Sequence, residues 1–201
     1  GGYQDIYVEP NTEYTITFWA YNPTDGTGSG IYYPSASGDD GTTWGGGTFD
    51  SSVEYAYIGN AGNACGSFVK FDNVTIFQGA IVSDAHVEFT SSSNLSGTTV
   101  NTNVYFQDAD DATAPTTLSG YNGLSLTAGV AWDSIPTWTT LGAYDTSDIS
   151  TALKEVVDRS GFSSGNSVMV VINDDGSSSN AYRLPRSIDY SYGTYKPELH
   201  V

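Results

Sequence analysis

Short segments of alternating apolar and polar residues, separated by loops rich in Gly, Ser, Asn and Asp, recur along most of this 201-residue chain. Alternation with a period of two is typical of half-buried β-strands, because successive side chains of a strand point to opposite faces of a sheet. The spacing predicts strands over residues 53–58, 67–71, 81–90, 100–107, 125–132, 167–172, 181–184 and 198–201. Many short strands at this spacing predict an all-β fold, a jelly-roll β-sandwich.

The clearest alternation lies between residues 81 and 89. A strict period of two specifies the register of a strand, since a slip by one residue would expose its whole apolar set. We expect one face of this segment to be buried and the other to be in contact with solvent. The residues expected on the buried face are Ile81, Ala85, Val87 and Phe89, and those expected on the polar face are Asp84, His86 and Glu88.

One short helix is predicted between about residues 145 and 159. Ile149, Leu153, Val156 and Val157 recur at helical spacing, and Gly161 follows as a stop signal. A lone helix with one apolar stripe in a β-rich chain usually packs over an open end of the sandwich.

Residues 1–33 are expected to form a unit of their own, ahead of a sandwich domain over residues 34–201. Two strands are predicted at 6–9 and 13–21, and a Gly-rich run that behaves as a linker follows. The second strand has an apolar face of Tyr14, Ile16 and Phe18. Two strands do not bury a core by themselves, so we expect this pair to add to a sheet of its own domain or of a neighbouring copy.

The charge of the chain limits its partners. It holds 23 Asp and Glu against 6 Lys and Arg, for a formal net charge of -17. Nucleic acid and anionic membranes are excluded as partners on this ground, because their binding depends on Lys and Arg. No apolar run approaches the ~18 residues of a membrane span, so no membrane insertion is expected. Divalent cations and neutral polymers remain compatible with such a surface.

Nothing in the sequence indicates an enzyme. The two histidines, His86 and His200, are expected on a solvated strand face and next to the end of the chain, away from a serine or cysteine nucleophile. Carboxylate pairs suited to glycoside hydrolysis are unavoidable among 23 acidic residues and carry no specific signal. Cys65, the single cysteine, is expected to be a small buried apolar residue.

Calcium is the one cofactor that the sequence favours, because Ca²⁺ takes carboxylate and carbonyl oxygens from loops, whereas a zinc site has few ligands to draw on. Acidic residues are also common in turns for conformational reasons alone, which is the alternative. The spaced set in the loop at residue 108 is the best candidate. The candidate ligands are Asp108, Asp110 and Asp111, then Asp39 and Asp40, then Asp174 and Asp175.

Carbohydrate recognition would require exposed aromatic rings with polar neighbours. Trp44 lies in a polar, Gly-rich stretch, and Tyr32 and Tyr33 lie in similar surroundings. These three are the candidate ligand-binding residues. The alternative for Trp44 is a loop anchor that folds down onto the sheet.

Residues 35–201 resemble a known group of extracellular modules. The similar stretches are FVKFDNVTIFQGAI (68–81), AHVEFT (85–90), VAW (130–132) with IPTW (135–138), and EVVDRSGF (155–162) with SGN (164–166). They resemble DNRLRE-type jelly-roll domains, akin to carbohydrate-binding module family 96, although Phe77 stands where that family tends to have Pro. Residues 6–21 resemble a short part of another carbohydrate-binding jelly roll. The resemblance implies an extracellular jelly roll and says little about sites.

Two functions follow as hypotheses for a non-catalytic module displayed outside the cell, on a cell surface or on a virion. The first is a structural subunit of a filament, virion appendage or surface array, which self-associates through its N-terminal strands with copies of itself or with other surface proteins. The second is a carbohydrate-binding or adhesive module attached to other domains and directed at a polysaccharide.

Overall fold

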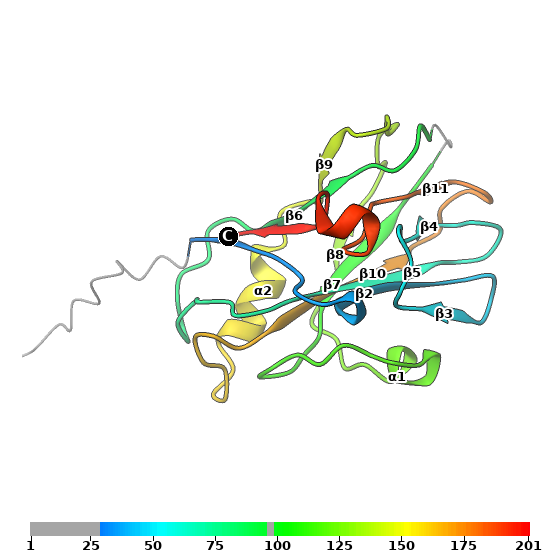
Figure 1. Cartoon of the computed structure of the whole chain (residues 1–201). Helices are drawn as coiled ribbons and strands as arrows, with labels where there is room; N and C mark the ends of the chain where they lie inside the picture. The colour runs from blue at the N-terminus through cyan, green and yellow to red at the C-terminus, as the bar shows by residue number, and fades with distance from the viewer. Residues whose placement is uncertain (1–28, 96–98) are drawn as a thin grey trace, which may run out of the picture.

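The computed structural model describes residues 29–95 and 99–201, and this part of the chain forms two antiparallel sheets packed face to face (Figure 1). The larger sheet has six strands in the order β3-β2-β5-β10-β7-β8, and the smaller has four in the order β1-β12-β6-β9. A two-stranded sheet, β11-β4, lies beside them. The all-β sandwich expected from the sequence is confirmed.

The elements are short. The six-stranded sheet consists of β3 (Thr48–Asp50), β2 (Asp40–Trp44), β5 (Gly66–Phe71), β10 (Val168–Asp174), β7 (Thr102–Phe106) and β8 (Val130–Trp132). The four-stranded sheet consists of β1 (Ile31–Tyr32), β12 (Glu198–His200), β6 (His86–Thr90) and β9 (Ala143–Asp145). The remaining elements are β4 (Ile58–Gly59), β11 (Tyr182–Arg183), the helices α1 (Leu118–Asn122) and α2 (Ser150–Val157), and the 3-10 turns η1 (Ser37–Asp39) and η2 (Tyr190–Gly193).

Strand β10 is buried on both of its faces. Its inner residues, Val170 among them, pack between the sheets in the main core. On the outer face, Met169 and Val171 pack with Phe68 of β5 and with Tyr121 of α1 in a second apolar cluster. The run Val-Met-Val-Val-Ile in β10 is therefore apolar without alternation because both faces are covered.

Strand β6 is buried on one face. Val87 and Phe89 lie in the core, whereas His86 and Glu88 are partly exposed, as the alternation predicts. The expectation for Ile81 is wrong, since its side chain is 74% exposed. Pairing with β12 and β9 imposes the register of β6, and this pairing begins at His86. Ile81 lies ahead of the paired residues, so the alternation does not fix the direction of its side chain.

Helix α2 confirms the predicted helix and covers the end of the sandwich between the two sheets (Figure 1). Its apolar stripe, with Leu153 and Val156, lies in the main core. The helix begins at Ser150, later than expected, because residues up to Asp145 pair with β6 as β9. Helix α1 is a second helix that the sequence analysis did not predict.

The first described strand lies inside the range that the sequence analysis gave to the N-terminal unit. Ile31 and Tyr32 pair with His200 and Leu199 of β12. The candidate assembly residues Tyr14, Ile16 and Phe18 lie outside the described residues. Across the described part of the chain, no helix combines the length and apolar character needed to cross a membrane.

Candidate functional site

Four aromatic side chains gather around Tyr57 beside the six-stranded sheet, and we call them the aromatic strip: Trp44, Tyr55, Tyr57 and Tyr182. Tyr57 is central, with its ring centroid 5.6 Å from that of Trp44, 6.1 Å from that of Tyr55 and 5.7 Å from that of Tyr182. All four rings remain partly exposed, and Tyr55 is the most open at 40%. The strip is a solvent-facing apolar surface edged by phenol hydroxyls.

The backbone under the aromatic strip is held firmly. The Tyr57 amide donates to the hydroxyl of Thr42 in β2 over 3.1 Å, and its carbonyl accepts from the hydroxyl of Ser67 in β5 over 2.6 Å. Tyr182 is placed by the pairing of β11 with β4. The segment 53–58 was expected as a strand, but only Ile58 lies in one. The rest of the segment pairs with residues 185–187, where the Ala56 amide donates to the Pro185 carbonyl over 3.0 Å and the Ser187 amide donates to the Glu54 carbonyl over 3.1 Å.

Trp44 is the last residue of β2 and opens a tight hairpin turn. Gly45 and Gly46 have φ of 61° and 76°, and the Gly47 amide donates to the Trp44 carbonyl over 3.3 Å. Two consecutive left-handed residues define a type I′ turn, which glycine adopts without steric cost. The Gly-rich stretch therefore fixes the indole at the rim of the sheet, where it is stacked on Tyr57 and partly exposed.

Two hollows flank Trp44. One, of about 280 Å³, is lined by Trp44, Val53, Glu54, Tyr55 and Tyr57. The other, of about 180 Å³, lies between Trp44 and α1, where Leu118 and Asn122 line it. Burial, together with the neighbouring Tyr55 and Tyr182, raises the pKa of Tyr57 above its ordinary value, so its phenol stays protonated. The site offers rings for stacking, phenols that donate hydrogen bonds and the exposed Glu54 carboxylate that accepts them.

The three predicted ligand-binding residues do not lie in one site. Tyr32 is buried, with its hydroxyl 3.3 Å from that of Thr75. Tyr33 is 38% exposed, and the Lys196 ammonium lies over its ring, 4.6 Å from the centroid. Both tyrosines line a separate hollow of about 690 Å³. The sequence analysis missed Tyr55, Tyr57 and Tyr182 as members of the same aromatic group as Trp44, although the alternation of Tyr55 and Tyr57 was visible.

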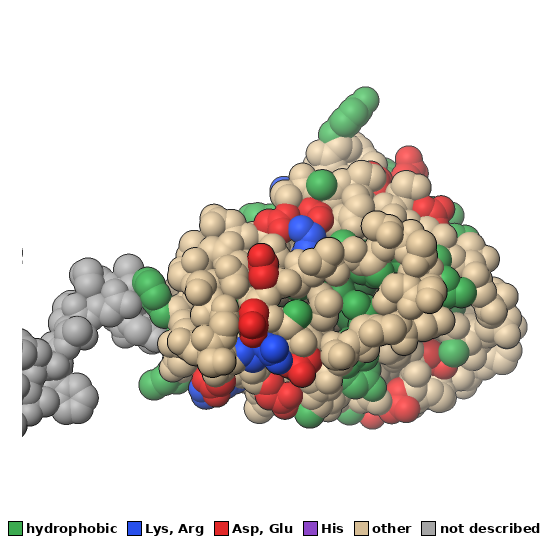
Figure 2. Space-filling model, turned by 90° about the horizontal axis from the view of Figure 1, so that it is seen from below, with side chains coloured by type: hydrophobic (Ala, Val, Ile, Leu, Met, Phe, Trp, Pro, Cys, Tyr) green, Lys and Arg blue, Asp and Glu red, His purple; other side chains and the backbone are tan. Residues whose placement is uncertain are grey.

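Two carboxylates of the acidic loop at residue 108 are already paired with an arginine side chain. Arg159 is paired with Asp108 and, over 2.6 Å, with Asp110, while the Asp111 carboxylate accepts from the amide of Ser167 over 2.8 Å. On the face drawn in Figure 2, most of the blue side chains of Lys and Arg lie beside red carboxylates in the same way. A calcium ion at this loop would compete with Arg159.

The other two acidic loops also have partners. Asp39 is 2.9 Å from the Lys70 ammonium, and Asp174 accepts from the Ser177 amide over 3.2 Å, whereas Asp175 is exposed. Asp40 is buried, and one of its oxygens accepts from the Ile188 amide over 2.8 Å while the other has no partner. Burial raises the pKa of Asp40 to about 7. Calcium stays a prediction at all three loops.

The two histidines, 86 and 200, lie next to each other, which the sequence analysis did not anticipate. Their rings are stacked with centroids 4.9 Å apart, on the outer face of the four-stranded sheet.

Cys65 is buried, as expected.

Comparison with known proteins found no family model that matches this chain and no similar protein among the curated ones. The fold and the site therefore define the class: an all-β sandwich with a solvent-facing aromatic strip beside two hollows. The resemblance to DNRLRE-type domains stays a prediction.

Proposed function

We propose that this chain is a non-catalytic carbohydrate-binding module, displayed outside the cell, whose aromatic strip binds a neutral polysaccharide. The observation that carries the proposal is the group of partly exposed rings around Tyr57, with Trp44 between two hollows. The apolar faces of sugar rings pack on aromatic side chains, while hydroxyls require nearby polar groups.

The charge of the protein favours a neutral glycan over an acidic one. The net charge is -17, and the exposed carboxylate of Glu54 lines the hollow beside Trp44. An anionic polymer would meet repulsion from both, whereas a neutral hydroxyl-rich chain donates hydrogen bonds to Glu54 at no such cost.

The test is binding to a panel of neutral polysaccharides, measured by affinity electrophoresis and calorimetry. Trp44→Ala and Tyr55→Ala should each weaken binding about tenfold or more, the loss typical of central aromatic contacts. Tyr192→Ala is the matched control, because Tyr192 is fully exposed and lies outside the aromatic strip. Equal binding by Trp44→Ala and the unsubstituted chain, with both folded by circular dichroism, would refute the proposal.

Self-assembly is the second candidate function, and an edge strand favours it. β1 lies at the edge of the four-stranded sheet, and its Ile31 side chain is 49% exposed. An edge of this kind accepts an added strand from another chain. Sedimentation of the full chain and of a form lacking residues 1–28, which keeps every described strand, tests the idea: assembly lost on deletion supports it, and unchanged assembly contradicts it.

A further inference from the structure

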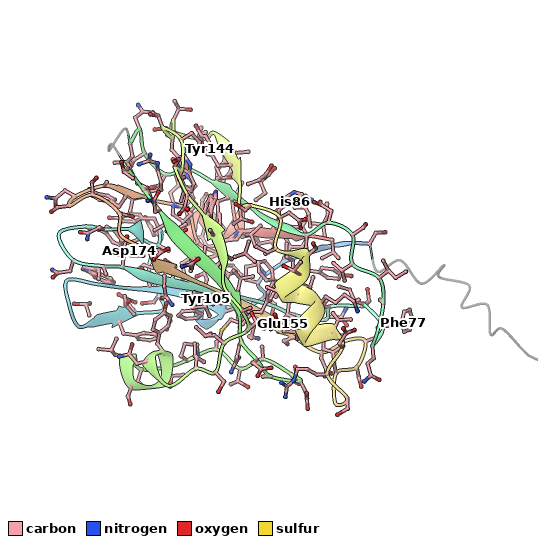
Figure 3. All side chains as sticks on the ribbon, turned by 180° about the vertical axis from the view of Figure 1, so that it is seen from behind. Phe77, His86, Tyr105, Tyr144, Glu155 and Asp174 are labelled. Atoms are coloured by element: carbon pink, nitrogen blue, oxygen red, sulfur yellow. The ribbon has the colours of Figure 1, made fainter. Side chains whose placement is uncertain are left out.

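Four side chains on the outer face of the four-stranded sheet form two cross-strand pairs. β6 and β12 run antiparallel, with Glu88 opposite Glu198 and His86 opposite His200. All four are partly exposed and alternate with buried residues, so they point away from the core. His86 is labelled on β6 in Figure 3. We call this set the Glu-His patch.

Three members of the Glu-His patch are spaced as metal ligands. Glu88, Glu198 and His200 each offer one ligand atom, and these three atoms lie within 4.8 Å of one another. The Nε2 atom of His200 is 3.3 Å from a carboxylate oxygen of Glu198. Two ligands held at ~2.1 Å from one ion in tetrahedral geometry are about 3.4 Å apart, so this pair already has the separation of neighbours in such a shell.

The His200 ring is held in place and has an unused nitrogen. Its Nε2 atom is buried and makes no hydrogen bond within the described part of the chain. The ring stacks on His86 at an interplanar angle of 6°, and Nδ1 of His86 is 3.3 Å from an oxygen of Asp84. A fixed imidazole with a free, buried nitrogen beside two carboxylates is prepared to bind a cation rather than to fill space.

The carboxylates around the Glu-His patch have only histidine as a basic partner among the described residues. Glu88 has Glu198 opposite on one neighbouring strand and Asp145 opposite on the other. Like charges directly opposite in a sheet destabilise it. Among the described residues, no lysine or arginine forms an ion pair with any of these three carboxylates. A bound divalent ion would supply the missing charge.

We propose that Glu88, Glu198 and His200 bind a divalent transition-metal ion of the zinc class, with His86 as a positioning residue. Imidazole together with carboxylates suits Zn²⁺, Co²⁺ and Ni²⁺, whereas Ca²⁺ takes six to eight oxygen ligands. The ion would join β12 to β6 across their outer face, with a further coordination position open to solvent. This site is separate from the aromatic strip and from the acidic loops.

The experiment is titration of the metal-stripped full chain, freed of any histidine tag, with ZnCl₂ in a calorimeter. One ion should bind per chain, and the visible spectrum with Co²⁺ should show four-coordinate absorption. Glu198→Gln and His200→Gln should each weaken Zn²⁺ binding by about tenfold or more. Asp133→Asn is the matched control, since it removes the same charge from an exposed carboxylate without an ion pair in the described structure and should leave binding unchanged.

Three results would overturn the proposal: no Zn²⁺ binding by the unsubstituted chain, equal binding by the Glu198→Gln, His200→Gln double variant, or displacement of Zn²⁺ by an equal concentration of Ca²⁺. If a variant does not fold, the imidazole ¹⁵N resonances of the unsubstituted chain decide the matter. Zinc should shift the His200 resonances more than any other, and unshifted His200 resonances would contradict the assignment.

Discussion

The two sheets of the sandwich use their outer faces differently. In the six-stranded sheet, residues 168–172 of β10 are all buried, because α1 and the segment around it cover the outside. In the four-stranded sheet, β6 alternates strictly, and its outer face carries His86 and Glu88. At β10 the larger sheet therefore has both faces packed, whereas at β6 the smaller sheet has one face in contact with solvent.

The largest expected effect comes from the covered face. Met169→Ala should lower the free energy of unfolding by about 2–5 kcal/mol, because Met169 is fully buried between β10 and the α1 segment. Thr90→Ala, on the outer face of β6, is the matched control and should change it by about 0.5 kcal/mol or less. Urea denaturation measures both, and equal losses would show that the α1 segment does not form a true second core.

Sequence reasoning found the elements marked by apolar runs or apolar periodicity and missed those without either. β10, β6 and the stripe of α2 were predicted because apolar residues alone mark them. β2 was missed since its buried positions include Asp40 and Thr42, whose burial depends on partners distant in sequence. Helix α1 has a single buried residue, Tyr121, and therefore no stripe to detect.

The candidate sites were predicted less completely than the fold. Trp44 was identified, because an indole in a Gly-rich polar stretch is conspicuous. Its contact with Tyr57 and the stacking of His86 on His200 depend on how separate segments meet in space. Local sequence patterns do not predict such contacts, because the contacts arise from strand order and register.

The second prediction concerns a charge inside the six-stranded sheet. Burial raises the pKa of Asp40 to about 7 in the folded chain, from an ordinary value of 3.8. Its contribution to stability is fully present below pH ~4 and is lost as the pH rises through ~7. Asp40→Asn should therefore stabilise the fold by about 2–4 kcal/mol at pH 8 and by much less at pH 4.

Denaturation midpoints of both proteins between pH 4 and pH 8 provide the measurement for Asp40. Glu54→Gln is a control for loss of one acidic group at an exposed position. A difference between Asp40→Asn and the unsubstituted chain that does not grow with pH would contradict the buried-carboxyl explanation.

The third prediction concerns calcium binding at the acidic loop in which two carboxylates are paired with Arg159. Calcium at about 10 mM should stabilise the fold by about 1 kcal/mol if it binds an acidic loop with the millimolar affinity of extracellular modules. The Asp108→Asn, Asp110→Asn double variant should abolish that gain if the loop paired with Arg159 is the site. Thermal melts with calcium and with chelator measure this stabilisation. Identical melting temperatures would contradict the prediction that the protein binds calcium.

The smallest effect is expected on the open face of the four-stranded sheet. In chelator, Glu88→Gln should stabilise the fold by about 0.2–1 kcal/mol, because it removes the carboxylate between Glu198 and Asp145. The gain should shrink at high salt, and Asp133→Asn should show none. Destabilisation by Glu88→Gln in chelator would mean that this carboxylate is not repelled by its neighbours.

The backbone pairing of Gly30 with Val201 has a mechanical consequence. Their amides and carbonyls exchange two hydrogen bonds of 3.0 Å, so β1 enters the sheet where β12 leaves it. A pull applied between these two residues would load the β1–β12 rungs one after another, as a zipper is opened, rather than all at once in shear. The fold would then yield at low force from this corner, and β1 would be the first strand to separate from its neighbour, β12.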